Sequence, residues 1–158
     1  MPQIVVNISD MKVTKSAKDV LATYSLGSCI GLAVFDPQYR IGGLIHCLLP
    51  TARNAPDKAE ENPYMFISSG VPMMVRQMIR YGAKRTNLIF KAAGGANMRG
   101  DNMFMTGDRN RAALLRLLEK NGIRLKGSDF GGTIPRTMYL HMDTGRVVVK
   151  SFGKEREL

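Results

Sequence analysis

The sequence predicts a single α+β domain that covers residues 1–158. Its length is typical of one folding unit large enough to bury a core. Hydrophobic residues make up 44% and charged residues 23% of the chain, and neither an internal repeat nor a change in composition marks a second domain. Short strand patterns that pair as hairpins are mixed with only a few helical patterns, which is the element order typical of α+β proteins.

The first third of the chain is predicted to be β-structure. The segment D-P-Q-Y-R at 36–40 has the composition of a turn and separates two β-like runs, which predicts a β-hairpin. Pro50 should end this hairpin, because proline cannot donate a hydrogen bond to a neighbouring strand. The strand patterns cover residues 3–6 with a weak continuation at 11–13, and then residues 20–24, 30–35 and 41–49.

A polar segment and a helix are expected next. Residues 51–63 contain two prolines and lack periodicity, so we expect a long exposed loop. A helix is predicted over 64–81, with Gly82 at its C-terminal end and a break or second start near Pro72. Four apolar residues recur at helical spacing and should face the core: Val71, Val75, Met78 and Ile79.

The second half of the chain predicts one further helix and several strands. The helix should begin with Thr106 as its N-cap and Asp108 in its first turn, and should end at 121–122. Gly94 and Gly95 begin a turn that follows a strand, and residues 143–145 form a hairpin turn. The strand patterns of this half cover residues 87–93, 123–129, 136–142 and 146–152.

Composition also predicts the compartment. The N-terminal segment lacks the basic start and long apolar run of a signal peptide, and charges, Gly and Pro interrupt every apolar run before it reaches the length of a membrane span. The two cysteines are too few for a disulfide framework and suit a reducing compartment. We therefore expect a cytoplasmic protein without direct membrane insertion.

The net charge predicts an acidic partner. The chain carries 23 Lys and Arg against 13 Asp and Glu, which gives a formal charge of +10. Charge alone does not distinguish nucleic acid, lipid headgroups and acidic protein. The chain has no Trp, few aromatic residues and none of the motifs that read RNA or DNA, so we expect no nucleic-acid partner.

A candidate nucleophile lies between glycines in the segment Gly27–Ser28–Cys29–Ile30–Gly31. Backbone N–H groups of such a turn can stabilise an oxyanion, and Ser28 and Cys29 are the candidate donors. A thiol needs a base or a positive neighbour to become nucleophilic at neutral pH. The predicted hairpin brings His46 to the same edge as Cys29. A buried apolar cysteine and a structural strand histidine would give the same spacing, so both interpretations stay open on this ground alone.

Two nearby residues refine this candidate site. Alternation along a strand sends Cys47 to the face opposite His46, so Cys47 is expected in the core and a metal site that uses both residues is disfavoured. We expect no metal. Thr23 could hydrogen-bond to His46 and fix its tautomer, although Thr23 is equally well explained as a residue that favours strands.

Three cations recur every fourth residue on and just beyond the predicted 64–81 helix: Arg76, Arg80 and Lys84. One interpretation is a solvated helix face. The other is a docking row for an acidic helix of a substrate or partner.

Several motifs together resemble one protein family. They are L-G-S-C-I-G-L-A-V-F-D-P-Q-Y-R-I-G-G-L-I-H-C-L-L-P at 26–50, G-G-A-N-M at 94–98, T-G-D-R-N at 106–110, D-F-G-G at 129–132 and the closing T-G-R-V-V-V-K. This pattern is similar to that of the CheD family, the chemoreceptor glutamine deamidases. The resemblance covers nearly the whole chain, and the S-C-I…H…L-L-P spacing is its specific part.

The resemblance implies a fold, a reaction and partners. The fold would be a layered β-sandwich with flanking helices, like the catalytic domain of cytotoxic necrotizing factor. Cys29 would be the nucleophile, His46 the general base and Thr23 the third catalytic residue in deamidation of glutamine to glutamate, through a thioester and without a cofactor. The substrates would be cytoplasmic helices of methyl-accepting chemotaxis proteins. Hydrolysis of methylated glutamates would use the same attack.

A second implied partner gives the alternative function. Many members of the family bind the phosphatase CheC, so the chain could instead be a non-catalytic basic interaction module that regulates a CheC-type phosphatase.

Overall fold

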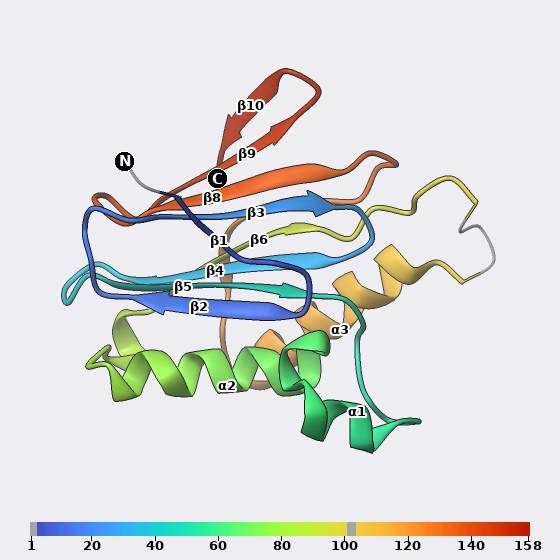
Figure 1. The fold of residues 1–158 in the computed structure, drawn as a ribbon, viewed down its shortest axis with the longest axis horizontal. Coiled ribbons are helices and arrows are strands. Elements are labelled where there is room, and N and C mark those ends of the chain that lie inside the picture. Colours follow the sequence, from blue (N-terminus) through green and yellow to red (C-terminus); the bar gives the residue numbers. More distant parts are fainter. Residues whose placement is uncertain (1–2, 101–103) are drawn as a thin grey trace.

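Two β-sheets packed face to face, with helices against one of them, form three layers (Figure 1). The structure is a computed structural model that describes residues 3–100 and 104–158. Sheet A has the order β1 (Gln3–Val5), β3 (Val20–Leu26), β8 (Arg136–His141), β9 (Arg146–Ser151) and β10 (Lys154–Glu157). Sheet B has the order β2 (Asp10–Thr14), β5 (Ile41–Cys47), β4 (Ile30–Asp36), β6 (Ile89–Gly94) and β7 (Leu125–Phe130). These two sheets with few helices confirm the predicted α+β class.

Three α-helices belong to the third layer: α1 (Pro56–Glu61), α2 (Ile67–Arg80) and α3 (Thr106–Lys120). Short 3-10 turns cover Pro63–Met65 and Arg85–Asn87. Figure 1 shows α2 and α3 on the side of sheet B that faces away from sheet A. Apolar residues of both helices pack there against sheet B, among them Ile67, Met74, Met78, Leu114 and Leu118.

Strands β4 and β5 are buried on both faces, because they contribute alternate residues to two different cores. Leu32, Ile45 and Cys47 face the helices. Ala33, Phe35 and Leu44 face sheet A and meet Leu21, Met138 and Leu140 in an inter-sheet core. This double burial explains the nearly continuous apolar sequence of the hairpin.

The predicted hairpin forms, and Asp36 holds its turn. The Asp36 side chain accepts backbone hydrogen bonds from Gln38 at 2.9 Å, Tyr39 at 3.0 Å and Lys84 at 2.8 Å. Burial acts to raise the pKa of this carboxyl, but these donors together with the Asn87 side chain hold the pKa below its usual value. The turn therefore anchors β4 to the segment that follows α2.

The N-terminal strand pattern divides differently from the prediction. Residues 3–6 and 11–13 were expected as one interrupted strand signal, but β1 belongs to sheet A and β2 to sheet B. Ser9, with a φ of 61°, lies where the chain crosses between the two sheets. A crossing of this kind depends on how the sheets stack, which a local pattern does not encode.

Five further expectations need correction. The predicted loop 51–63 contains α1, and β10 follows β9 where no separate strand was expected. Helix α2 runs through Pro72 without a break, since the carbonyl that loses its partner belongs to the exposed Ser68. Ile79 is exposed rather than buried. The N-cap of α3 is Met105 in the left-handed region at φ 51°, so Thr106 is the first helical residue and not the cap.

Gly94 ends β6 in a conformation that excludes other residues. Its φ is 113°, and a Cβ at this position would overlap the carbonyl oxygen of Cys29. The next residue, Gly95, donates its N–H to that same carbonyl at 2.9 Å. The 94–95 turn thus depends on glycine for close contact with the candidate nucleophile.

Gly94→Ala should therefore destabilise the protein by about 2 kcal/mol or more beyond a matched control, and should disturb the backbone at Cys29. The control is Gly122→Ala, whose φ of 68° is also positive but lies in the left-handed region that alanine tolerates better, and whose Cβ would meet nothing within 4 Å. Urea unfolding of both variants measures the difference. Equal destabilisation of the two variants would contradict the predicted overlap.

Candidate active site

Thr23 and His46 meet between the two sheets. Thr23 lies in β3 of sheet A and His46 in β5 of sheet B, and both side chains are fully buried. Thr23 Oγ1 lies 2.7 Å from His46 Nδ1. The structure therefore brings together the two residues that the sequence offered as base and orienting group.

The two hydrogen bonds of the Thr23 hydroxyl determine the tautomer of His46. Thr23 Oγ1 donates its single proton to the carbonyl of Val6 at 2.6 Å, so it must accept the hydrogen bond from His46. Nδ1 consequently carries the imidazole proton and Nε2 has a free lone pair. Within residues 3–100 and 104–158, Nε2 has no hydrogen-bond partner. A neutral histidine with an available Nε2 is the form that acts as a general base.

Cys29 lies just before β4 and faces the same inter-sheet core as His46. In the β4–β5 ladder Gly31 pairs with His46 and Ile30 with Cys47. Cys29 is therefore a diagonal neighbour of His46 across the ladder, at roughly 7 Å between Cα atoms. The Cys29 residue is 6% exposed, so only a small part of it can be reached from solvent.

Both reactive groups are uncharged at neutral pH. Burial raises the pKa of the Cys29 thiol to about 11, although the backbone N–H of Cys29 acts in the opposite direction. Burial lowers the pKa of His46 to about 4. The site therefore holds a thiol and a neutral imidazole rather than a preformed thiolate–imidazolium pair.

Residues 27–29 form a loop that we term the nucleophile loop. Hydrogen bonds to its three backbone carbonyls hold it in place. The carbonyls of Gly27 and Cys29 accept the backbone N–H groups of Ala96 and Gly95, each at 2.9 Å. The carbonyl of Ser28 accepts the side-chain Nδ2 of Asn110 at 2.9 Å. A planar trans peptide joins each carbonyl to the next N–H, so these bonds also fix the directions of the Ser28 and Cys29 N–H groups.

Asn110 was missed as a site residue by the sequence analysis. It is fully buried on α3, and its Nδ2 also donates to the carbonyl of Leu48 at 3.0 Å. The available signal was a polar residue within the otherwise apolar stripe of the helix, four residues before Leu114.

Cys47 lies on the opposite face from His46, as expected, and packs with Ile45 in the core beneath the helices. Both cysteines are free. Among the described residues, no group of three or more His, Cys, Asp or Glu side chains is arranged to hold a metal ion.

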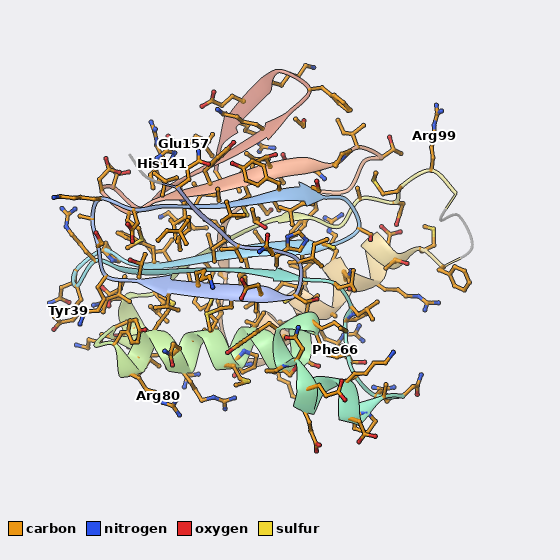
Figure 2. The ribbon with its side chains drawn as sticks, in the orientation of Figure 1. Tyr39, Phe66, Arg80, Arg99, His141 and Glu157 are labelled. Atoms are coloured by element: carbon orange, nitrogen blue, oxygen red, sulfur yellow. The ribbon has the colours of Figure 1, made fainter. Side chains whose placement is uncertain are left out.

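Arg76, Arg80 and Lys84 lie far from Cys29. All three are exposed, and the Lys84 backbone bonds to Asp36 at the end of β4 opposite to Cys29. The length of β4 puts this end roughly 20 Å from the nucleophile. Figure 2 shows Arg80 at the same end of the molecule as Tyr39 of the hairpin turn.

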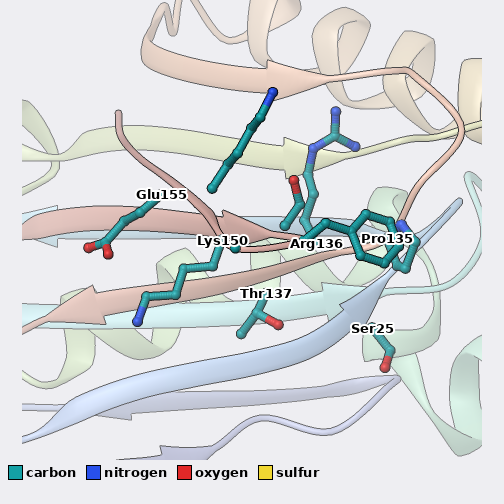
Figure 3. Close-up of a pocket in the computed structure, with 10 residues that line it drawn as sticks. Ser25, Pro135, Arg136, Thr137, Lys150 and Glu155 are labelled. Atoms are coloured by element: carbon teal, nitrogen blue, oxygen red, sulfur yellow. The ribbon is translucent and has the colours of Figure 1, made fainter.

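A separate hollow of about 440 Å³ opens between the start of β8 and the β9–β10 hairpin (Figure 3). Arg136, Lys150 and Glu155 are among its lining residues, whereas Cys29 and His46 are not. The Arg136 guanidinium also bonds to the Gly94 carbonyl and to Asp129, both at 3.4 Å. Arg136 therefore connects the lining of this hollow to the 94–95 turn, whose Gly95 N–H bonds to the Cys29 carbonyl.

Comparison with known proteins assigns the family. The family model described as CheD chemotactic sensory transduction matches residues 48–151. A "probable chemoreceptor glutamine deamidase CheD" of Solibacter usitatus is 45% identical over 100% of this chain and 94% of its own length. A "probable chemoreceptor glutamine deamidase CheD 1" of Syntrophus aciditrophicus is 39% identical over 97% of this chain and 96% of its own length.

The chain belongs to the CheD family. The family model begins after His46, but the relatives align across the whole site, including a CheD of Archaeoglobus fulgidus that is 39% identical over 94% of this chain and 92% of its own length. The fold of this CheD protein is also similar to a solved structure, a Neisseria meningitidis protein of family DUF152. The TM-score is 0.51 at 12% identity, over 84% of this chain and 64% of the other.

The described helices of this CheD protein include none that is both long and apolar enough to cross a membrane.

The buried neutral thiol predicts a distinctive alkylation profile. Iodoacetamide should modify Cys29 about tenfold faster with each pH unit from about pH 7 to about pH 10, because only the thiolate reacts and burial raises the thiol pKa. Peptide mass analysis over time measures this rate, and Cys29→Ala reports any background from Cys47, which is fully buried. A rate that is already constant below pH 7 would show a thiolate–imidazolium pair instead.

Proposed function

We propose that this protein deamidates glutamine side chains in the cytoplasmic helices of chemoreceptors. The observation that carries the proposal is the Thr23–His46 hydrogen bond, which leaves Nε2 unprotonated on the face that also presents Cys29. Membership of the CheD family supports the substrate, since the relatives are named as chemoreceptor glutamine deamidases. The protein would act in the cytoplasm, where such helices are exposed.

The first half of the reaction forms a thioester. Nε2 of His46 takes the thiol proton as Cys29 Sγ attacks the side-chain carbonyl carbon of the glutamine. The resulting imidazolium then gives this proton to the departing nitrogen, and the C–N bond breaks to release ammonia. Because both groups start neutral, the charge separation arises only with substrate present.

The second half regenerates the enzyme. His46 removes a proton from water, which attacks the thioester carbon, and the C–S bond breaks. The thiol recovers its proton from the imidazolium, and the product is glutamate. Thr23 stabilises the imidazolium by accepting the Nδ1–H bond throughout the cycle. No step requires a metal or cofactor.

The N–H groups of Ser28 and Cys29 are the proposed oxyanion donors. The hydrogen bonds on the Gly27 and Ser28 carbonyls support this role, because they preorganise both N–H groups before the substrate binds. Each such donor contributes about 3 kcal/mol to transition-state stabilisation in comparable sites.

Other parts of the proposal rest on the family resemblance. They are a sandwich of the cytotoxic necrotizing factor type, binding to a CheC phosphatase, and hydrolysis of methylated glutamates by the same nucleophile. Regulation of a CheC-type phosphatase without catalysis is the alternative function, and it would leave the Thr23–His46 arrangement without a use.

The direct test is incubation of a receptor cytoplasmic fragment with the wild-type protein. Intact-mass and peptide analysis should find glutamine converted to glutamate, and Cys29→Ala should lower the rate by about 10⁴-fold or more because the nucleophile is lost. Cys47→Ala is the matched control: it makes the same change on the opposite face and should keep the activity. If the wild-type protein converts no glutamine in several receptors, the non-catalytic function is favoured.

Arg76, Arg80 and Lys84 form the proposed docking row for acidic segments. Because the row lies far from Cys29, it should act on capture through long-range attraction and not on the chemical step. The double variant Arg76→Glu, Arg80→Glu should raise KM about threefold or more at low salt and leave kcat within about twofold. The control Lys120→Glu, Lys126→Glu makes the same change in net charge on α3 and β7. Identical salt dependence of KM in both double variants would overturn the assignment.

A further inference from the structure

Asn110 links the helix layer to both strands that carry the reactive residues. Its side chain emerges from α3, is fully buried, and donates from Nδ2 to the carbonyls of Ser28 and Leu48. Ser28 precedes Cys29 at the start of β4, and Leu48 follows shortly after His46 at the end of β5. One amide group therefore ties the nucleophile loop to the strand of the base.

The bond to Ser28 acts on the proposed oxyanion donor. The Ser28 carbonyl and the Cys29 N–H belong to the same planar peptide group and point in opposite directions. When Asn110 holds the carbonyl, it also sets the direction of the N–H. The bond to the Leu48 carbonyl fixes the position of the Asn110 side chain, because the β4–β5 ladder already holds the strand that Leu48 follows.

Asn110 brings a cost in stability as well as a gain. Both carbonyls need a donor, so Nδ2 must face them, and Oδ1 has no hydrogen-bond partner within the described part of the chain. A buried acceptor without a partner is unfavourable. An apolar residue would continue the buried stripe formed by Leu114 and Leu118 and would remove this cost, but it would leave the carbonyls of Ser28 and Leu48 without this donor.

We propose that Asn110 is a positioning residue that aims the Cys29 N–H at the developing oxyanion. The inference deepens the proposed function and rests on it. Asn110 does not contact the substrate. It acts on the oxyanion donor through the peptide group that joins Ser28 and Cys29. Its loss should therefore impair steps that create an oxyanion and spare steps that do not.

Two variants and one control separate this role from a general structural one. Asn110→Asp keeps the size of the side chain, but an ionised carboxylate cannot donate to the two carbonyls and a protonated carboxyl can donate to only one of them. Asn110→Ser retains a single donor on a shorter side chain and serves as the partial rescue. Asn121→Asp makes the same change at the exposed end of the same helix.

Three measurements are made on each variant. The first is deamidation of a receptor fragment, with kcat and KM determined separately. The second is the iodoacetamide rate of Cys29, a substitution that creates no oxyanion. The third is protection of Cys29 from iodoacetamide by a peptide that contains glutamate γ-semialdehyde. In this adduct a C–S bond forms, and the thiol proton passes to the aldehyde oxygen, which occupies the oxyanion position.

The expected result is a selective loss. Asn110→Asp should lower kcat and weaken aldehyde protection, each by about tenfold or more, with KM within about threefold. The alkylation rate should stay within about twofold of wild type. Asn110→Ser should lie between Asn110→Asp and wild type, and Asn121→Asp should match wild type.

Other outcomes overturn the proposal. A parallel fall in alkylation and deamidation would show that Asn110 only maintains the fold or the thiol, and unfolding of both Asn110 variants by circular dichroism would lead to the same conclusion. No change in any readout would also reject it. If the wild-type protein converts no glutamine, the proposed function fails, yet the aldehyde measurement still decides the role of Asn110 because it does not depend on turnover.

Discussion

The hydrogen bond between Thr23 and His46 crosses the interface between the two sheets, and the orientation of the proposed base, His46, depends on it. Leu21, Leu44 and Met138 pack in the core between the same two sheets and support this 2.7 Å contact. The Thr23 hydroxyl is itself directed by the Val6 carbonyl, so the chain from β1 to β3 determines which imidazole nitrogen carries the proton. Under the proposed function, the inter-sheet core would thus be part of the catalytic apparatus as well as a source of stability.

Burial creates the electrostatic character of the site. A thiol and an imidazole that are both neutral carry little desolvation cost between the sheets, whereas a permanent ion pair there would carry a large one. The charges that develop during attack need a local donor, which the nucleophile loop can supply through backbone groups that are already in place. The neutral thiol is less reactive than a preformed thiolate would be. Under the proposed function it becomes a nucleophile only when a substrate is correctly bound.

Local chemistry in the sequence predicted the β4–β5 hairpin, because the turn at 36–40 and the alternation around His46 and Cys47 depend on neighbouring residues. The Thr23–His46 pair joins residues 23 positions apart, so it could be named as possible but not established without knowing how the sheets stack. The division of β1 and β2 between sheets and the contacts of Asn110 were not predictable for the same reason. They are set by tertiary packing, which local propensity does not describe.

The burial of Cys29 has a consequence for its durability in the cell. Peroxide attacks the thiolate form of accessible cysteines, and Cys29 is 6% exposed with a thiol pKa raised to about 11. Cys47 faces the other core, so its side chain is directed away from any disulfide with Cys29. The proposed nucleophile should therefore be oxidised slowly in the folded protein, because little of its thiol is ionised at neutral pH.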